Sequence, residues 1–223
     1  MITVHHLENS RSQRVLWLLE ELGLEYRIKQ YKRDPQTMLG PDSLKKIHPL
    51  GKSPVIKDGD HVIAESGAII EYLVGRYGDG RLIPPAGSDE RLSYTYWLHY
   101  AEGSLMPLLL IKLIFERLAK PPMPLLMRPA AALIAMGVKG KFVDPRLKDQ
   151  LDWVEQSLAV SGWFAGDDFS AADIQMSFPL EAAVARGTAG PGRPNIRAFV
   201  ERIHARPAYG AALKRGGPYD FSG

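Results

Sequence analysis

The 223-residue sequence contains no cysteine. This absence excludes disulfide bonds, cysteine-ligated zinc or iron–sulfur sites, and any reaction in which a protein thiol is the nucleophile. If sulfur chemistry takes place here, the sulfur must belong to a second molecule. Hydrophobic residues make up 45% and charged residues 24% of the chain, which is typical of folded, water-soluble domains rather than of disordered chains.

Other features are also missing. The first residues lack a basic segment followed by an apolar core, so no secretory signal is expected and a cytoplasmic location is the default. The two most apolar stretches, residues 105–115 and 123–138, are interrupted by prolines and charged residues. We interpret them as buried helices too short to cross a membrane, and expect no membrane partner. The net charge is only +3, and its basic residues are interspersed with acids, so nucleic-acid binding has little support.

The first 78 residues alternate between strand and helix periodicity. Residues 2–7 predict a strand, the leucine-rich segment 15–22 a helix, and residues 24–31 a second strand. An Asp-Gly turn at residues 58–59 separates two short apolar runs, 54–57 and 61–64, which indicates a β-hairpin. A helix is predicted at 67–77. This order describes a small open α/β sheet.

A Gly- and Pro-rich segment at residues 79–90 predicts a linker. Beyond it, residues 91–118, 145–159, 171–186 and 196–206 have helical patterns, with a kinked Pro-rich connection at 120–129. Ser170 and Asp173 match a helix capping box. The predicted fold is therefore α/β plus all-α: an N-terminal domain over 1–78 and a helical C-terminal domain over 91–223. The tail from residue 216 is expected to be mobile.

Three segments place polar groups at one edge of the predicted sheet. Ser10 lies where the first strand gives way to the first helix, a position that favours an anion, although Ser10 and Gln13 also fit a capping box. Pro54 opens a short strand and is a candidate cis proline that would leave the Ser53 backbone free for a peptide-like ligand; the alternative is an ordinary edge-strand proline. The pair at 65–66 precedes a helix and forms either a second anion site or a plain cap.

The adjacent histidines His5 and His6 give no support for a metal site. Neighbouring strand residues point to opposite faces, and no carboxylate or spaced histidine completes a ligand set. We therefore expect no bound metal.

Residues 10–23, 48–54 and 64–69, with the capping box at 169–174, resemble cytosolic glutathione transferases in sequence and spacing. The resemblance covers nearly the whole chain and is strongest to the serine-type classes, in particular a subgroup found in bacteria and fungi. It implies a thioredoxin-like N-terminal domain followed by a C-terminal helical bundle domain, a homodimer, and glutathione as co-substrate. Detoxification in the cytoplasm would be the role of such an enzyme.

The resemblance also implies roles for individual residues. Ser10 would stabilise the glutathione thiolate, with Arg11 adding positive charge nearby, while Asn9, Arg11 or Ser12 could take the activating position instead. Six residues would bind glutathione: Asn9, Lys52, Ser53, Pro54, Glu65 and Ser66. A small apolar electrophile would lie against the first long helix of the second domain, at Trp97, Tyr100 and Met106, unless these side chains pack in the core.

The resemblance implies a reaction in which the thiolate of glutathione attacks the electrophile. A thiol with a reference pKa near 8.5 is mostly protonated at neutral pH, so the site must favour the anion. Hydroperoxide reduction, thiol–disulfide exchange and non-catalytic glutathione binding stay open as alternatives, because a fold does not fix a function.

Overall fold

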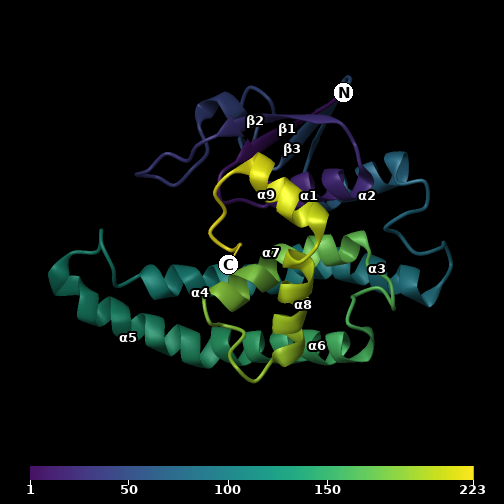
Figure 1. The fold of residues 1–223 in the computed structure, drawn as a ribbon. Helices are drawn as coiled ribbons and strands as arrows, with labels where there is room; N and C mark the ends of the chain where they lie inside the picture. Colours follow the sequence, from purple (N-terminus) through teal and green to yellow (C-terminus); the bar gives the residue numbers. More distant parts are fainter. Residues whose placement is uncertain (223) are drawn as a thin grey trace.

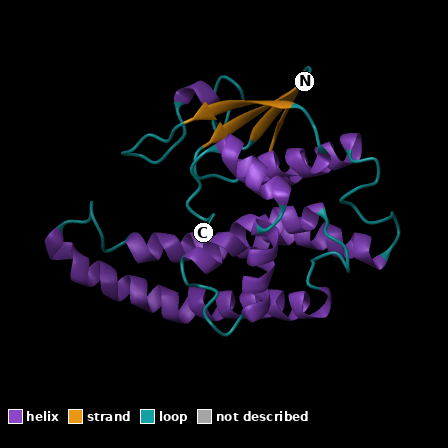
Figure 2. Ribbon diagram, in the orientation of Figure 1, coloured by secondary structure: helices purple, strands orange, loops and turns teal. Residues whose placement is uncertain are grey.

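The computed structural model describes residues 1–222, and its N-terminal part is a four-stranded sheet with helices on one face (Figures 1 and 2). The strands are β1 (Ile2–Leu7), β2 (Tyr26–Tyr31), β3 (Val55–Asp58) and β4 (His61–Ala64), in the order β2-β1-β3-β4. β1 is parallel to β2 and antiparallel to β3, and β3 pairs with β4 as the predicted hairpin. Helices α1 (Ser12–Leu22) and α2 (Ser66–Tyr77) complete this domain.

The rest of the chain is helical. α1 and α2 contact α7, so they lie between the sheet and the helical domain (Figure 1). The helical elements are α3 (Asp89–Tyr100), α4 (Met106–Arg117), α5 (Arg128–Val138), α6 (Asp144–Ser161), α7 (Ala171–Ala185), α8 (Pro194–His204) and α9 (Pro207–Gly216). The predicted fold class is confirmed. No helix or strand lies between the end of α2 and the start of α3, where the sequence predicts a linker.

The capping box predicted at the start of α7 is present. The Ser170 hydroxyl accepts a hydrogen bond from the backbone N–H of Ala172, and the Asp173 carboxylate accepts one from the N–H of Ser170 at 2.8 Å. A second N–H, from Phe164, reaches the same carboxylate at 2.9 Å. Burial nevertheless raises the pKa of Asp173 to about 6. The box therefore fixes where α7 begins, and α7 is the helix on which both domains pack.

The apolar stretch at 105–115 belongs to a longer helix than the sequence predicts. α3, a π-helical turn (Ala101–Leu105) and α4 run on as one continuous helix, Asp89–Arg117. Pro107 does not break it, because it directly follows the π-helical turn, where the regular i→i−4 hydrogen bonding is already interrupted. By length and composition alone this 29-residue helix could cross a membrane, which corrects the expectation of a shorter one. The core helix of a soluble protein meets the same criterion.

The second apolar stretch is a helix, as predicted, but it is not buried. Along α5 only Ala131 and Ala135 are buried, whereas Leu133, Ile134 and Met136 are each about 60% exposed or more. The expectation of a buried helix is wrong here, because α5 packs mainly against α4 on one side and projects away from the other helices (Figure 1).

The C-terminal segment returns to the N-terminal domain instead of being mobile. α9 packs along α1, and Tyr219 beyond it is only 7% exposed. The hydroxyls of Tyr209 and Tyr219 each donate to the buried carboxylate of Glu181, at 2.6 Å. The tail is therefore ordered through Tyr219, because its aromatic ring and hydroxyl both find partners in the core. The expectation of a mobile tail is wrong over this part.

Candidate active site

A cleft of about 700 Å³ lies between the edge of the sheet and the start of α4. All three segments singled out from the sequence contribute to its wall, together with loop residues after β2. The lining residues that matter below are Ser10, Arg11, Arg33, Lys52, Ser53, Pro54, Glu65, Ser66, Glu102 and Leu110. The tertiary structure thus brings together groups separated by up to a hundred positions along the chain.

Ser10 reaches the cleft at the start of α1, but it does not cap the helix as a Ser-x-x-Gln box would. The N-cap position is Arg11, which makes no side-chain cap. The Ser10 hydroxyl lies 2.8 Å from that of Ser12 and accepts the Ser12 N–H at 3.2 Å. Ser12 is fully buried and does not line the cleft. Its hydroxyl lies 2.8 Å from His6 Nδ1, so a Ser10–Ser12–His6 chain leads from the cleft into the core.

Asn9 does not line the cleft. Its side-chain oxygen accepts a hydrogen bond from the N–H of Asp220, and its carbonyl accepts one from Arg33. Its φ of 49° lies in the left-handed region, which asparagine tolerates better than most residues. The structure therefore ties Asn9 to the C-terminal segment, and its predicted role in binding glutathione stays a prediction.

The peptide bond between Ser53 and Pro54 is cis, as predicted. The Ser53 hydroxyl donates to the carbonyl of His5 at 2.9 Å and accepts the N–H of Leu7 at 3.3 Å. Its side chain is thus held by β1, and both Ser53 and Pro54 lie on the cleft wall. Lys52 is exposed beside them, at the cleft.

Glu65 and Ser66 lie where β4 passes into α2. Glu65 is exposed on the cleft wall with a φ of 68° and makes no cap hydrogen bond. Ser66 is buried, and its hydroxyl accepts a hydrogen bond from Arg14 Nη2 at 2.6 Å. The plain helix cap is therefore not what this pair forms.

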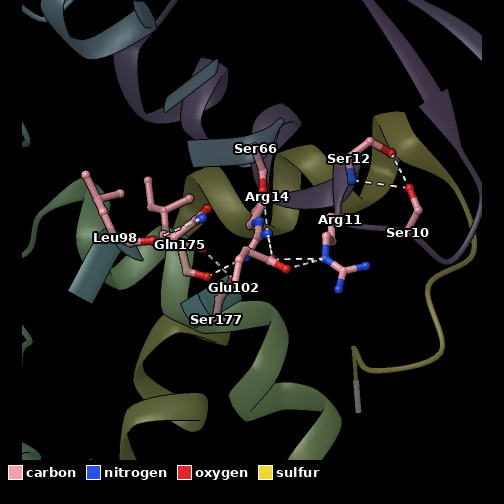
Figure 3. A network of polar contacts seen from close by, with 10 residues as sticks. Ser10, Arg11, Ser12, Arg14, Ser66, Leu98, Glu102, Gln175 and Ser177 are labelled. Atoms are coloured by element: carbon pink, nitrogen blue, oxygen red, sulfur yellow. Dashed lines mark hydrogen bonds and ion pairs between the residues drawn. The ribbon is translucent and has the colours of Figure 1, made fainter. Parts of the chain in front are cut away.

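Arg14 and Glu102 form a buried polar network that joins the two domains (Figure 3). The Arg14 side chain is 1% exposed and pairs with the Glu102 carboxylate, while its second nitrogen donates to the carbonyl of Gln175. Arg11 Nε donates to both oxygens of Glu102, at 2.9 and 3.0 Å. Burial would raise the pKa of Glu102, but the two guanidinium groups outweigh it and hold the pKa below its usual value.

The network also explains where Arg11 sits. Its guanidinium lies 5.1 Å from the centre of the Phe178 ring and pairs with Glu102, the carboxylate that also pairs with Arg14. The positive charge predicted near the serine is present on the cleft wall, but it is shared with a carboxylate. Sequence patterns missed Arg14 and Glu102, because their partners lie about ninety residues apart. One local signal of a buried ion pair exists: Arg14 is a charged residue next to the apolar residues of α1.

Trp97, Tyr100 and Met106 lie in the core and not on the cleft. They are 4%, 6% and 7% exposed, and none lines the cleft. Trp97 packs on Phe164 and Tyr100, and the Tyr100 hydroxyl donates to the carbonyl of Gln150. The prediction that they meet an electrophile is not supported, because the same face of α3 is needed to pack on α6. Leu110, one turn further along α4, faces the cleft instead.

His5 and His6 are buried on β1 and take different partners: His5 Nδ1 lies 2.8 Å from the Tyr31 hydroxyl, and His6 contacts Ser12. Burial lowers the pKa of both imidazoles, helped at His5 by Lys29 and Lys57 and opposed at His6 by the Gly216 carbonyl. Within residues 1–222, no group of three His, Asp or Glu side chains is arranged to hold a metal ion.

These shifts predict a loss of stability in mild acid. The native state keeps both histidines neutral while the unfolded chain takes up protons below about pH 6.5, so the free energy of unfolding falls as the pH drops below that value. The slope is at most about 1.4 kcal/mol per pH unit for each histidine.

Denaturant titrations between neutral and mildly acidic pH should show a shallower fall in the free energy of unfolding for His5→Gln and His6→Gln than for the wild type. His61→Gln, on the exposed surface of β4, should keep the wild-type slope; equal slopes in all variants would contradict the assignment.

Comparisons with known proteins agree with this architecture. The N-terminal domain family of glutathione S-transferases matches residues 1–75, and their C-terminal domain family matches residues 141–207. The chain is 36% identical to glutathione S-transferase 3 of Schizosaccharomyces pombe, over 96% of this chain and 88% of that one. It is 35% identical to glutathione S-transferase 1 of Saccharomyces cerevisiae, over 96% of this chain and 95% of that one.

Solved structures give the same result. A glutathione S-transferase from Actinobacillus pleuropneumoniae has a TM-score of 0.79 and 34% identity, covering 100% of this chain and 96% of that one. A sphingomonad glutathione S-transferase in complex with glutathione has a TM-score of 0.72, covering 96% and 98% of the two chains, and at 22% identity shows a shared fold. Two matched domains, the fungal relatives and the cleft between the domains together show that this chain belongs to the glutathione S-transferase family and is a glutathione transferase.

Proposed function

We propose that the cleft binds glutathione with its sulfur at Ser10 and transfers it to an apolar electrophile. The observation that carries this proposal is the convergence of Ser10, the Ser53–Pro54 turn and the Glu65–Ser66 pair on one cleft wall. Glutathione has a peptide-like middle, a γ-glutamyl end bearing an ammonium group, and two carboxylates. The cleft offers partners for all of these groups.

Charges on the wall match the charges of the tripeptide. Glu65 is an exposed carboxylate and can pair with the γ-glutamyl ammonium, while the buried hydroxyl and N–H of Ser66 lie at the start of α2, where a carboxylate is favoured. Lys52 and Arg33 line the same cleft and can meet the second carboxylate. In this proposal the backbone of Ser53, on the same cleft wall, pairs with the cysteinyl unit.

Activation of the thiol falls to Ser10 in this proposal. If the His6 Nε2–H donates to the Gly216 carbonyl, then Nδ1 is an acceptor, and the Ser12 hydroxyl donates to it at 2.8 Å in preference to the Leu7 carbonyl at 3.3 Å. Ser12 is then an acceptor towards Ser10, which can either donate to Ser12 or turn its hydrogen to the sulfur. A thiolate is the stronger acceptor, so binding would turn the Ser10 hydroxyl into the cleft and lower the thiol pKa. This is the serine-type chemistry.

The electrophile would lie at the open side of the cleft, against Leu110 of α4 and the exposed Leu39.

A homodimer is part of the proposal. It is supported by exposed apolar side chains on both domains, Val62 of β4 (43%) and Leu92 of α3 (73%), which a twofold arrangement could bury against each other. Glutathione is the thiol of the reducing cytosol, which supports a cytoplasmic role in detoxification.

The proposal is tested by calorimetric titration with glutathione and by conjugation of a chloronitroarene. Glu65→Gln should weaken glutathione binding by about tenfold, since a charge-assisted hydrogen bond contributes about 1.5 kcal/mol or more. Glu71→Gln changes the same residue type on the exposed surface of α2 away from the cleft and should bind as the wild type does. No affinity for glutathione would refute the proposal.

Parallel assays separate the activities that one bound thiolate can support. Turnover of the chloronitroarene shows conjugation, turnover of an organic hydroperoxide shows peroxidase activity, and turnover of a mixed disulfide shows exchange. Binding without turnover in any of the three would make the protein a non-catalytic glutathione-binding module.

A further inference from the structure

The end of α4, the following loop and α5 form a hairpin that projects from the helical domain (Figure 1). Its turn, defined here as the hairpin tip, is residues 123–127, including the short helix Leu125–Met127. Leu125, Leu126 and Met127 are 76%, 96% and 58% exposed. Single exposed apolar side chains are common, but three in a row at a projecting turn, next to the exposed face of α5, form a contiguous apolar surface that needs a partner.

Positive charge accompanies this hairpin. Between Glu116 and Asp144, residues 117–143 contain five basic residues and no acidic residue. Arg117, Lys120 and Arg128 lie on either side of the tip, whereas Lys139 and Lys141 follow the far end of α5. Three positive charges therefore flank the apolar tip, and Arg117 and Lys120 are exposed.

From this combination we propose that the hairpin tip inserts into the surface of an anionic lipid bilayer. An apolar turn ringed by lysine and arginine is the arrangement of interfacial membrane anchors: the apolar side chains enter the boundary between headgroups and acyl chains, and the cations meet anionic headgroups. The protein lies on the membrane and does not span it. This revises the expectation that it has no membrane partner, and it does not depend on the proposed roles of the cleft residues.

Two other occupants fit the surface less well. A second copy related by a twofold axis would bring the same patch against itself, and five cations without an acid would then repel their own copies. A nucleic acid would satisfy the cations but would leave Leu125, Leu126 and Met127 against a polar, hydrated backbone. A bilayer offers anionic groups and an apolar interior in the same surface.

The continuous helix Asp89–Arg117 does not serve as a spanning segment in this proposal. Its middle holds Glu102, which is paired with Arg11 and Arg14 of the other domain, and Tyr94 and Trp97 are buried in the core. Inserting that helix would require unpacking both domains. The tip, by contrast, is exposed already.

The test is cosedimentation of the full-length protein with vesicles made of equal parts phosphatidylcholine and phosphatidylglycerol, with pure phosphatidylcholine vesicles as the neutral comparison. Wild-type protein should partition to the anionic vesicles and be released by salt. Leu125→Gln/Leu126→Gln should lower the partition coefficient roughly tenfold or more, since it removes the two most exposed apolar side chains of the tip. Arg117→Gln/Lys120→Gln should lower it by roughly fivefold per charge.

A matched control is available in the same chain. Val160→Gln removes an apolar side chain that is 86% exposed but lies on α6 away from the tip, and its partition should equal that of the wild type. A Leu126→Trp reporter should show a blue shift in fluorescence with anionic vesicles only. The tip variants should keep wild-type conjugation rates, because no tip residue lines the cleft.

Three outcomes would overturn the proposal: no partition of the wild type to anionic vesicles, the same partition for Leu125→Gln/Leu126→Gln as for the wild type, or an equal loss in the Val160→Gln control. Sedimentation velocity without lipid adds a fourth. If Leu125→Gln/Leu126→Gln converts a larger species to a smaller one, the tip is an interface between copies of the chain and not a membrane contact.

Discussion

Arg14→Met should lower the free energy of unfolding by about 3 kcal/mol and weaken glutathione binding as well. Removing one partner of a buried ion pair costs about 3–5 kcal/mol, because it leaves the other charge without compensation. For Arg14 we expect a cost at the lower end of this range, because the Glu102 side chain is 31% exposed and keeps its ion pair with Arg11. Methionine fills part of the volume but donates to neither Ser66 nor the Gln175 carbonyl.

The measurements are urea unfolding and calorimetric titration with glutathione. Because Arg14 donates to the Ser66 hydroxyl at 2.6 Å, its loss frees Ser66 from the position in which we propose that it meets the γ-glutamyl end. We expect a tenfold weaker affinity, which corresponds to about 1.4 kcal/mol. Arg14→Lys keeps the charge but not the fork that reaches three acceptors at once, so it should recover only part of the loss.

A second variant keeps the test decisive if Arg14→Met does not fold. Glu102→Gln removes the carboxylate charge from the other side and leaves Arg14 buried without an anion. If both variants unfold within about 0.5 kcal/mol of the wild type, which is the range of ordinary surface substitutions, the network does not stabilise the domain interface as argued here.

Ser10→Ala should reduce the rate of conjugation at neutral pH by roughly 10- to 150-fold. A hydroxyl that donates to a charged group contributes about 1.5–3 kcal/mol, and each 1.36 kcal/mol is tenfold in rate. Without it, the pKa of the bound thiol should rise by roughly one to two units. The loss should therefore be largest at neutral pH and should shrink in alkaline solution, where the thiol ionises without help.

A pH profile of kcat/KM for both proteins checks this, with the ultraviolet absorbance of bound thiolate as an independent readout. Ser12→Ala is the matched control, since Ser12 is buried and does not line the cleft. It should cause a smaller loss, through the orientation of Ser10 alone. A wild-type profile in Ser10→Ala would move the activating role to Arg11, the other residue of this turn on the cleft wall.

The local pattern of the chain determined most of the secondary structure. Alternating apolar residues gave β1 and β2, the Asp-Gly turn gave the β3–β4 hairpin, and Ser170 with Asp173 marked the start of α7. These features depend on neighbours within a few positions, where backbone geometry and hydrogen bonding act directly. For the same reason the three segments that line the cleft could be located, since each lies at a junction between a strand or turn and the next element.

Which side chains are buried, and which of them contact one another, was decided only by the tertiary structure. The sequence places Trp97 and Leu110 on one long apolar helix, but only packing against α6 shows that the first is core and the second faces the cleft. The sequence likewise shows that α5 is apolar, but it does not show that one face of this helix is left exposed. Arg14 and Glu102 meet across 88 positions, and no local pattern records such a contact. A side chain's chemistry belongs to its residue type, but whether that chemistry serves a core, a cleft or a surface depends on what the rest of the chain folds against it.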